Sequence, residues 1–347
     1  MKRVPPHGQR QKRLRIVDDT MPGITRRRLK RAGRAAFAYY APSGHRITDR
    51  AEIDRLNAVA LPPAYEHAWF CPDPGGHLLA TGIDARGRKQ YRYHPAFRLT
   101  RESAKFDSTA RFGRLLPRLR ARVEHDLALT SLCRDRAIAS VVRLLDTGAI
   151  RIGNEAYAKI NRSFGATTLR MRHARLRGRV LRLSFAAKSG KAAELALTDP
   201  ALLRFVRAMQ DLPGQHLFQY MDDGGAACPV TSSDVNAWLR EVMGEAVTAK
   251  QFRTWHASVL AFERLAGADG KVSLKALAAE VSDRLGNTPA VARKSYIHPA
   301  VLELVDQQVE WRVNLRLPRA ARWLGRAERG LIALLEAGPK AQDLLAG

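Results

Sequence analysis

The hydrophobic pattern of this 347-residue chain changes near residue 105. Before that point, short apolar segments alternate with turn residues, which is typical of strands. After it, apolar residues recur at helical spacing, first in 111–127. We therefore expect an α+β fold, in which a small β-rich domain (1–96) is joined by a linker (97–104) to a larger, mainly α-helical domain (105–347).

A second β-like segment, from about residue 167 to residue 198, interrupts the helical part. Leu181 and Leu183 alternate with Arg182, and this period of two predicts strands that bury one face. Turn residues divide the segment, so we expect a small three-stranded antiparallel sheet. Six arginines and no acidic residue lie in 170–182, which predicts a strongly cationic face on this sheet.

A short segment with helix-capping residues, GNTPAVARKSY at 286–296, lies near the end of the helical part. Thr288 can accept a hydrogen bond from a free N–H group of a helix, and Pro289 suits its first position because proline has no N–H to lose. Pro299 bars continuation, so we expect Tyr296 at the end of a short basic helix. Tyr296 can either pack its ring against the core or face a bound phosphate, and this stretch does not decide between them.

The balance of charges indicates what the chain binds. It has 59 lysines and arginines against 33 acidic residues, and a formal net charge of +26. Such a field attracts polyanions, of which nucleic acid is the commonest. An anionic membrane surface is the competing partner, but no apolar run approaches the ~18 residues of a membrane-spanning helix. The amino terminus, up to about Arg15, is expected to be a basic arm that either solvates the protein or contacts phosphate.

Two features predict the compartment. The basic amino terminus is not followed by an apolar core, so it does not predict a signal peptide. The three cysteines, Cys71, Cys133 and Cys228, are odd in number and widely spaced, which argues against a disulfide framework or a zinc site. We therefore expect the protein in a reducing cytoplasm.

The segment 89–93, KQYRY, follows a turn at 84–87 and is expected to be the second strand of a hairpin. The period of two places Tyr91 and Tyr93 on one face of this strand and Gln90 on the other. Tyrosines interleaved with basic residues can stack on bases or sugars while the cations hold phosphates. Packing of the aromatic rings across the strands is the alternative.

Several common kinds of site are absent from the sequence. No phosphate-binding G-x-x-x-x-G-K-[ST] loop occurs, so ATP use is not expected. No C-x-x-C or H-E-x-x-H motif occurs, and no acidic cluster suits a two-metal site. What remains is cations and a tyrosine. Arginine and lysine donors can stabilise a phosphodiester under attack, tyrosine can act as a covalent nucleophile, and a lysine can protonate the departing oxygen.

Five motifs, in this order, resemble the small type IB DNA topoisomerases, the poxvirus-like group with bacterial members. They are TGIDARGRKQYRYH at 81–94, RIGNEAY at 151–157, FAAKSGK at 185–191, KQFR at 250–253 and RKSY at 293–296. The resemblance covers most of the chain, from about Gly23 to Leu304.

The resemblance implies an enzyme that relaxes supercoiled DNA by transient cleavage of one strand, through a 3′-phosphotyrosyl intermediate, and religation. It implies Tyr296 as nucleophile, Lys188 as general acid, and three ligands of the phosphate oxygens: Arg151, Arg253 and Asn287. The residues implied to contact DNA are Gln90, Tyr91, Tyr93, Tyr157 and Lys250. The implied partner is double-stranded DNA, bound by a monomer in the cytoplasm at the nucleoid, with no ATP, metal or other cofactor and no membrane.

Asn287 departs from the family pattern, in which many members have a histidine before Thr-Pro. Asparagine can still donate a hydrogen bond to a phosphate oxygen, but it carries no charge. The departure therefore affects how strongly a transition state is stabilised, and it leaves the nucleophile in place.

Two other functions remain open on the sequence. A tyrosine recombinase shares the same chemistry, although its second-arginine motif is usually His-x-x-Arg where this chain has KQFR. An architectural DNA-binding protein without catalytic activity would explain the charge, but it would leave the order of the motifs to chance.

Overall fold

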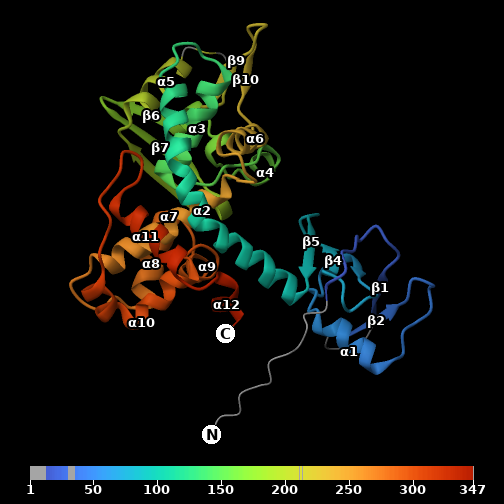
Figure 1. Ribbon diagram of the computed structural model, residues 1–347. Helices are drawn as coiled ribbons and strands as arrows, with labels where there is room; N and C mark the ends of the chain where they lie inside the picture. Colours follow the sequence, from blue (N-terminus) through green and yellow to red (C-terminus); the bar gives the residue numbers. More distant parts are fainter. Residues whose placement is uncertain (1–12, 30–35, 211, 213, 347) are drawn as a thin grey trace. The chain divides into compact units, whose positions relative to one another are not determined.

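The computed structural model describes residues 13–29, 36–210, 212 and 214–346 (Figure 1). The chain divides into two compact units between Glu102 and Ser103. Most of the expected basic arm, residues 1–12, lies outside the described residues. No helix in the described part of the chain is both long and apolar enough to cross a membrane.

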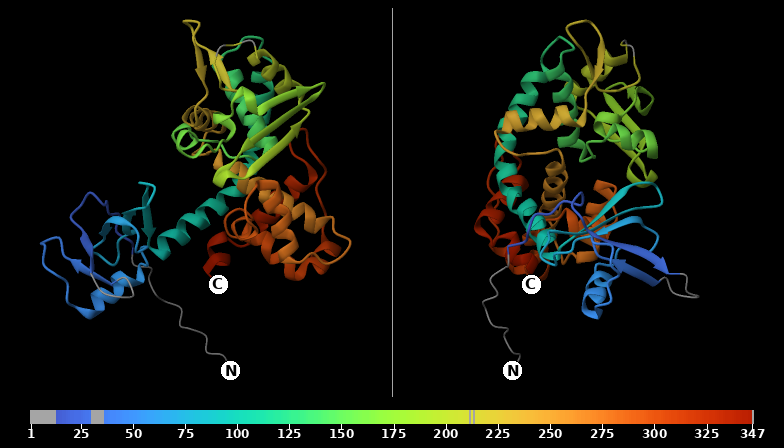
Figure 2. Two further views of the ribbon diagram at one scale, coloured as in Figure 1. Left: turned by 180° about the vertical axis from the view of Figure 1, so that it is seen from behind. Right: turned by 90° about the vertical axis from the view of Figure 1, so that its right-hand side faces the viewer.

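The first unit is built on a five-stranded antiparallel sheet in the order β2-β1-β3-β4-β5, which confirms the expected β-rich fold of this part. Helix α1 (Arg50–Ala58) packs on the sheet, and Figure 2 shows it in blue beside the strands. Its start is set by Asp49, whose carboxylate accepts a hydrogen bond from the N–H of Ala51. The strands are β1 (Ile24–Leu29), β2 (Ala36–Tyr40), β3 (Glu66–Phe70), β4 (Leu78–Ile83) and β5 (Lys89–Tyr93).

Strand β1 was not predicted from the sequence. Its residues, ITRRRL, contain three consecutive arginines and lack a clear alternation of apolar and polar side chains. Arg26 nevertheless turns inward, where it donates to the carbonyl of Leu61 at 2.8 Å and lies over the Phe37 ring, 4.4 Å from its centroid. Contacts between distant segments thus place a charged side chain in the sheet, and a local pattern does not show them.

The hairpin between β4 and β5 forms where the sequence predicted it. Asp84 organises the turn, because its carboxylate accepts hydrogen bonds from the N–H groups of Arg86 (2.9 Å) and Arg88 (3.0 Å). Gly87 has φ +71°, a backbone conformation that favours glycine. The turn sequence therefore fixes the register of β5 against β4.

The second unit is mainly helical, as predicted, with α3 and α7 in its core. Side chains that are fully buried include Ile138, Val142 and Leu145 of α3, and Phe252 and Trp255 of α7. Helix α2 (Pro95–Leu127) begins in the first unit and continues into the second. The other helices of the second unit are α3 (Arg134–Gly148), α4 (Glu155–Asn161), α5 (Pro200–Gln210), α6 (Ser232–Met243), α7 (Lys250–Ala266), α8 (Leu274–Leu285), α9 (Pro289–Ser295), α10 (Pro299–Asn314), α11 (Arg326–Ala337) and α12 (Ala341–Ala346).

Residues 97–104, which we expected to link the two domains, are helical. Helix α2 begins at Pro95, where Nδ1 of His94 accepts a hydrogen bond from the N–H of Ala96 at 3.1 Å. No side chain in 95–102 is buried, so the apolar spacing that marks a helix in a sequence starts only later. The helix therefore begins well before the residue at which the pattern predicts it.

The predicted three-stranded antiparallel sheet is present in the order β6-β7-β8. Its inner face buries Leu181 and Leu183, and its exposed face carries Arg175, Arg177 and Arg182, so the cationic face is confirmed. The strands are β6 (Ala174–Arg177), β7 (Val180–Ala186) and β8 (Ala192–Leu197). A separate two-stranded ribbon consists of β9 (Gln219–Met221) and β10 (Ala227–Pro229).

The first strand of this sheet starts later than expected, because residues 166–168 and 171–173 form short 3₁₀ turns. The N–H of Gly165 donates to the hydroxyl of Thr168 at 2.9 Å, and the N–H of Arg170 donates to Nδ1 of His173 at 3.0 Å. Such bonds from backbone to side chain compete with strand pairing. The strand therefore begins only after these turns.

Partly buried ion pairs connect the helices around α7. Arg120 of α2 pairs with Asp146 of α3 and with Glu328 of α11, each at 2.7 Å. Glu328 also accepts a hydrogen bond from Nε1 of Trp255 on α7, at 3.2 Å. Helix α7, which carries part of the candidate site, is therefore joined through Glu328 to a network that also includes α2, α3 and α11.

Candidate active site

A cleft of about 360 Å³ in the second unit brings together residues from distant parts of the chain. They come from the loop after α3, helix α4, the β7–β8 hairpin, the start of α7 and the end of α9. The predicted site residues that line the cleft are Arg151, Tyr157, Lys188, Lys250, Arg253 and Tyr296. Asn287 adjoins them through hydrogen bonds to two of these side chains.

Helix α9 forms as its sequence predicts and ends at Tyr296. The hydroxyl of Thr288 accepts a hydrogen bond from the N–H of Val291 at 3.4 Å, and Pro289 is the first helical residue. At the end of the helix, the N–H groups of Tyr296 and Ile297 both donate to the carbonyl of Ala292, each at 3.1 Å. The phenol therefore extends from the end of a short helix, and the side chain is half-buried in the cleft.

The backbone around Tyr296 is held by two side chains from other helices. The hydroxyl of Ser258 on α7 accepts a hydrogen bond from the N–H of His298 at 3.0 Å and lies 3.4 Å from the carbonyl oxygen of Tyr296. From α2, Nζ of Lys105 donates to the carbonyl of Ser295 at 2.9 Å. A cation at the last carbonyls of a helix is favourable there. The position of Tyr296 is thus set by α2 and α7 together.

Arg253 is a buried cation beneath the tyrosine. Only 3% of the residue is exposed, and its guanidinium lies 4.9 Å from the centroid of the Tyr296 ring. Two backbone carbonyls hold it: Nη1 donates to Ala149 at 2.6 Å and Nη2 to Leu285 at 2.9 Å. Its Nε is buried and has no hydrogen-bond partner among the described residues. A buried donor without a partner is suited to a ligand.

The charges around Tyr296 lower the pKa of its phenol. Burial raises this pKa, but the positive charge of Arg253 opposes it most strongly, followed by a hydrogen bond from Arg253 and the charges of Arg151 and Lys250. The net pKa is below the ordinary value of 10.0. A phenol next to fixed cations is a better nucleophile at neutral pH than a free tyrosine, because more of it is phenolate.

Asn287 joins the two arginines. Its Oδ1 accepts hydrogen bonds from Nη2 of Arg151 and from Nη2 of Arg253, the latter at 3.2 Å. Its Nδ2 is buried and lacks a hydrogen-bond partner within the described part of the chain. Gly286, with φ +62°, ends α8 and turns the chain so that the amide of Asn287 reaches this position. One oxygen atom thus collects donors from both guanidinium groups.

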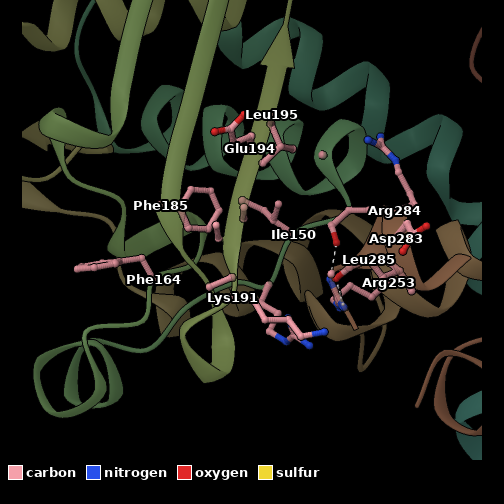
Figure 3. A pocket seen from close by; sticks show the side chains of 17 residues that line it. Ile150, Phe164, Phe185, Lys191, Glu194, Leu195, Arg253, Asp283, Arg284 and Leu285 are labelled. Atoms are coloured by element: carbon pink, nitrogen blue, oxygen red, sulfur yellow. Dashed lines mark hydrogen bonds between the residues drawn. The ribbon is translucent and has the colours of Figure 1, made fainter. Parts of the chain in front are cut away.

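Lys188 lines the cleft from the β7–β8 hairpin. It lies in the loop of the β7–β8 hairpin, where residues 188–191 are exposed. Behind the hairpin is a second cavity, of about 220 Å³, lined by Phe185, Lys191, Arg253 and Leu285 among others. Figure 3 shows these side chains around the cavity, with Lys191 at the end of the hairpin loop and Arg253 on α7. Among the described residues, no group of His, Cys, Asp and Glu is placed to hold a metal ion.

Two protein-family models match the chain. Residues 94–312 match the family described as eukaryotic DNA topoisomerase I, catalytic core, and residues 36–84 match the bacterial DNA topoisomerase IB, N-terminal domain. The chain belongs to the type IB DNA topoisomerases. This topoisomerase relaxes supercoiled DNA, and DNA is its substrate, as the resemblance implied.

Two relatives agree with this assignment. The DNA topoisomerase 1B of Acanthamoeba polyphaga mimivirus is 28% identical over 305 residues, which cover 84% of this chain and 90% of that protein. The DNA topoisomerase 1 of Mycosarcoma maydis is 25% identical over 181 residues, which cover 47% of this chain and 18% of that protein. All of the cleft residues lie inside the segment that matches the catalytic core.

The other predicted DNA contacts belong to the first unit of the topoisomerase, on strand β5. The rings of Tyr91 and Tyr93 are stacked with centroids 6.0 Å apart, which confirms that they share a face. Tyr91 is 47% exposed. Gln90 is half-buried, and its Nε2 donates to the carboxylate of Asp84 at 2.9 Å. The tyrosines thus present an aromatic surface, while Gln90 is tied to the turn.

Sequence reasoning missed Ser258 and Lys105, which hold the backbone next to Tyr296. Neither belongs to a motif, and the contact of Lys105 with Ser295 spans 190 residues. Ser258 does lie on the same helix as Arg253, five residues later, which is the one signal that the sequence contains. It also missed the hydrogen bond from Lys191 to Asn287, because the two residues are 96 positions apart.

Proposed function

We propose that Tyr296 is the nucleophile of the topoisomerase. Its phenol oxygen attacks a backbone phosphorus, a 3′-phosphotyrosyl bond forms, and the bond from phosphorus to the 5′-oxygen breaks. Lys188 gives a proton to that oxygen, which leaves as a 5′-hydroxyl. After the free strand has rotated, the hydroxyl attacks the phosphotyrosine and restores the DNA. One phosphoester replaces another at each step, so the reaction needs no ATP.

The observation that carries this proposal is the convergence of Arg151 and Arg253 on one oxygen atom beside Tyr296. The two guanidinium groups share Oδ1 of Asn287 as acceptor. A non-bridging phosphate oxygen can accept from two such donors in the same way, and it binds them more strongly than an amide oxygen does because it carries charge. Fixed donors of this kind stabilise the charge that develops on a phosphodiester under attack, and here they take the part that a metal ion plays elsewhere.

Asn287 is the third proposed phosphate ligand. Its amide oxygen faces the arginines, and its buried Nδ2 has no partner among the described residues. We assign Nδ2 as the donor to a second phosphate oxygen. In this role Asn287 supplies a hydrogen bond without a charge, where many family members have a histidine.

The proposed DNA contacts lie in both units. In the second unit, Tyr157 and Lys250 line the cleft next to Tyr296. In the first, the exposed ring of Tyr91 and the half-buried ring of Tyr93 stacked on it can contact sugars or bases, with Gln90 at the neighbouring position. We propose that the β-rich domain (1–96) and the catalytic domain (105–347) grip one duplex, connected through residues 97–104. We further propose that the enzyme acts as a monomer at the nucleoid in the cytoplasm, without nucleotide, metal or membrane.

The test is relaxation of a supercoiled plasmid in EDTA without ATP, by the wild type and by Tyr296→Phe. We expect relaxation by the wild type and none by the variant, which still binds DNA. Tyr220→Phe, on strand β9 outside the cleft, is the matched control and should relax the plasmid normally. Equal relaxation by the wild type and Tyr296→Phe would refute the nucleophile. A covalent protein–DNA adduct that forms with the wild type alone would support it directly.

A further inference from the structure

The hairpin loop that carries Lys188 has few contacts of its own. The N–H of Ala187 donates to the carbonyl of Lys191 at 2.7 Å, and the N–H of Gly190 donates to the carbonyl of Ala187 at 3.0 Å. Ser189 and Gly190 both have positive φ, +66° and +74°. These two bonds close the loop, but they do not attach it to the rest of the site.

The side chain of Lys191 makes that attachment. Its Nζ donates to the backbone carbonyl of Asn287 at 2.9 Å. Asn287 is itself fixed to α8, because its N–H donates to the carbonyl of Ser282 at 3.0 Å. The next residue, Thr288, is the N-cap of the helix that ends at Tyr296. A single hydrogen bond thus connects the loop of Lys188 to the segment that leads to the nucleophile.

Packing does not replace this hydrogen bond. The space between the base of the hairpin and the turn after α8 is the cavity of about 220 Å³ (Figure 3). A cavity has no atoms to hold the hairpin at that point, and residues 188–192 are exposed on the other side. The base of the hairpin is fixed at Ala186, whose carbonyl accepts from the N–H of Phe164 at 2.7 Å, and at Ala187, which packs against the core. Beyond that base, the side chain of Lys191 is the contact among the described residues that orients the exposed loop.

We infer that Lys191 is a positioning residue, which docks the hairpin so that the Nζ of Lys188 faces the departing 5′-oxygen. This inference rests on the proposed role of Lys188 as general acid. Lys191 itself contacts neither the reacting phosphorus nor the leaving oxygen in this assignment. It acts through the geometry of its neighbour, so its loss should slow only the step that needs the proton of Lys188.

That difference can be measured with two DNA substrates, one with the natural bridging 5′-oxygen at the cleavage site and one with sulfur in its place. Attack by Tyr296 expels an alkoxide from the first, which needs a proton. From the second it expels a thiolate, which needs none because thiols have a pKa of about 8.5. A defect in general-acid catalysis is therefore restored by sulfur, while a defect in phosphate binding or folding is not.

The experiment is single-turnover cleavage of both substrates by the wild type and by Lys188→Met, Lys191→Met and the double variant. We expect Lys191→Met to cleave the oxygen substrate about tenfold more slowly, the factor that corresponds to one hydrogen bond from a charged donor, and to cleave the sulfur substrate at the wild-type rate. The double variant should be no slower than Lys188→Met. Lys271→Met, which removes an exposed lysine outside both cavities, controls for the loss of one charge.

The outcomes separate the inference from the proposal on which it rests. If Lys188→Met is slow with both substrates, the proposed general acid is wrong and the inference is wrong with it. If sulfur restores Lys188→Met but not Lys191→Met, or if Lys191→Met is not slowed, the inference alone is overturned. Amide hydrogen exchange gives a readout without DNA: it should become faster for 187–191 in Lys191→Met, and unchanged exchange would also overturn the docking role.

Discussion

The two sides of the cleft are held in different ways. On one side, which we call the arginine side, Arg151, Arg253, Asn287 and Tyr296 form a connected set, and Arg253 is 3% exposed with two backbone carbonyls as acceptors. On the other side, Lys188 lies in an exposed loop attached through the side chain of Lys191. In the proposed mechanism the first group must hold phosphate throughout the reaction, whereas the second is needed only when a bond to the 5′-oxygen breaks or forms. The arginine side, which is buried and held by several hydrogen bonds, is thus the side that the mechanism needs throughout the reaction.

The largest expected effect of a substitution is on the arginine side. Arg253→Ala removes donors to the phosphate and should slow cleavage by about a thousandfold. It should also lower the free energy of unfolding by ~2–4 kcal/mol, because the carbonyls of Ala149 and Leu285 lose their donors in a buried place. Single-turnover cleavage and denaturant unfolding measure the two effects. Arg253→Lys should not restore activity, since an ammonium group cannot span the same acceptors.

Arg151→Ala is the matched variant within the same side. Arg151 is half-buried, and its guanidinium donates to the side chain of Asn287 rather than to a backbone carbonyl. We expect a loss of activity of the same order as for Arg253→Ala, but a change in the free energy of unfolding within about 1 kcal/mol. Equal destabilisation by both variants would show that the backbone acceptors of Arg253 do not distinguish it.

A smaller loss of activity is expected from Asn287→Asp. A carboxylate at this position binds both guanidinium groups more tightly than an amide oxygen does. It also repels the phosphate and removes the proposed Nδ2 donor, so cleavage should slow by about a hundredfold while the melting temperature stays the same or rises. Asn287→Ala, which loses the amide without adding charge, should retain more activity than Asn287→Asp. The reverse order would argue against a phosphate ligand at position 287.

His298, whose N–H donates to Ser258 next to Tyr296, predicts a dependence of stability on pH. His298 is 3% exposed, and burial lowers its pKa from 6.5 to about 4. The unfolded chain therefore takes up a proton near pH 6.5, and the folded protein does not do so until about pH 4. Folding is favoured fully above that window and loses stability as pH falls through it, by ~2 kcal/mol between about pH 7 and about pH 5.

Denaturant unfolding at the two pH values tests this expectation. The difference between them should be smaller in His298→Gln than in the wild type, even if the variant is less stable at both. His125→Gln is the control, because the side chain of His125 is 74% exposed. An unchanged difference in His298→Gln would mean that other groups produce the pH dependence.

The comparison of the two sides also explains what the sequence could predict. Signals between neighbouring residues were sufficient for helix α9, where Thr288 and Pro289 start the helix, and for the β4–β5 turn organised by Asp84. The identities of the cleft residues followed from the order of the motifs. Helix α9 and the β4–β5 turn each depend on a short stretch of chain, and both form where the sequence predicted them.

Contacts between distant segments were not predictable. The carbonyls that hold Arg253 belong to Ala149 and Leu285, at separations of 104 and 32 residues, and Lys191 reaches Asn287 across 96 residues. Each needs the tertiary fold to bring its partners together, and no local pattern encodes it. The same reason explains the inward Arg26 of β1, whose acceptor, the carbonyl of Leu61, is 35 residues away.

The smallest expected effect concerns the edge of the arginine side. Lys250 lies at the start of α7, is exposed, and contributes less than Arg253 and Arg151 to lowering the pKa of Tyr296. Lys250→Met should raise that pKa, so the rise of the cleavage rate with pH should move to higher pH, by less than in Arg151→Ala. The phenolate absorbance of each protein, minus that of its Tyr296→Phe counterpart, measures the titration. A downward shift in Lys250→Met would contradict the role of the surrounding cations, because removing a positive charge can only disfavour the phenolate.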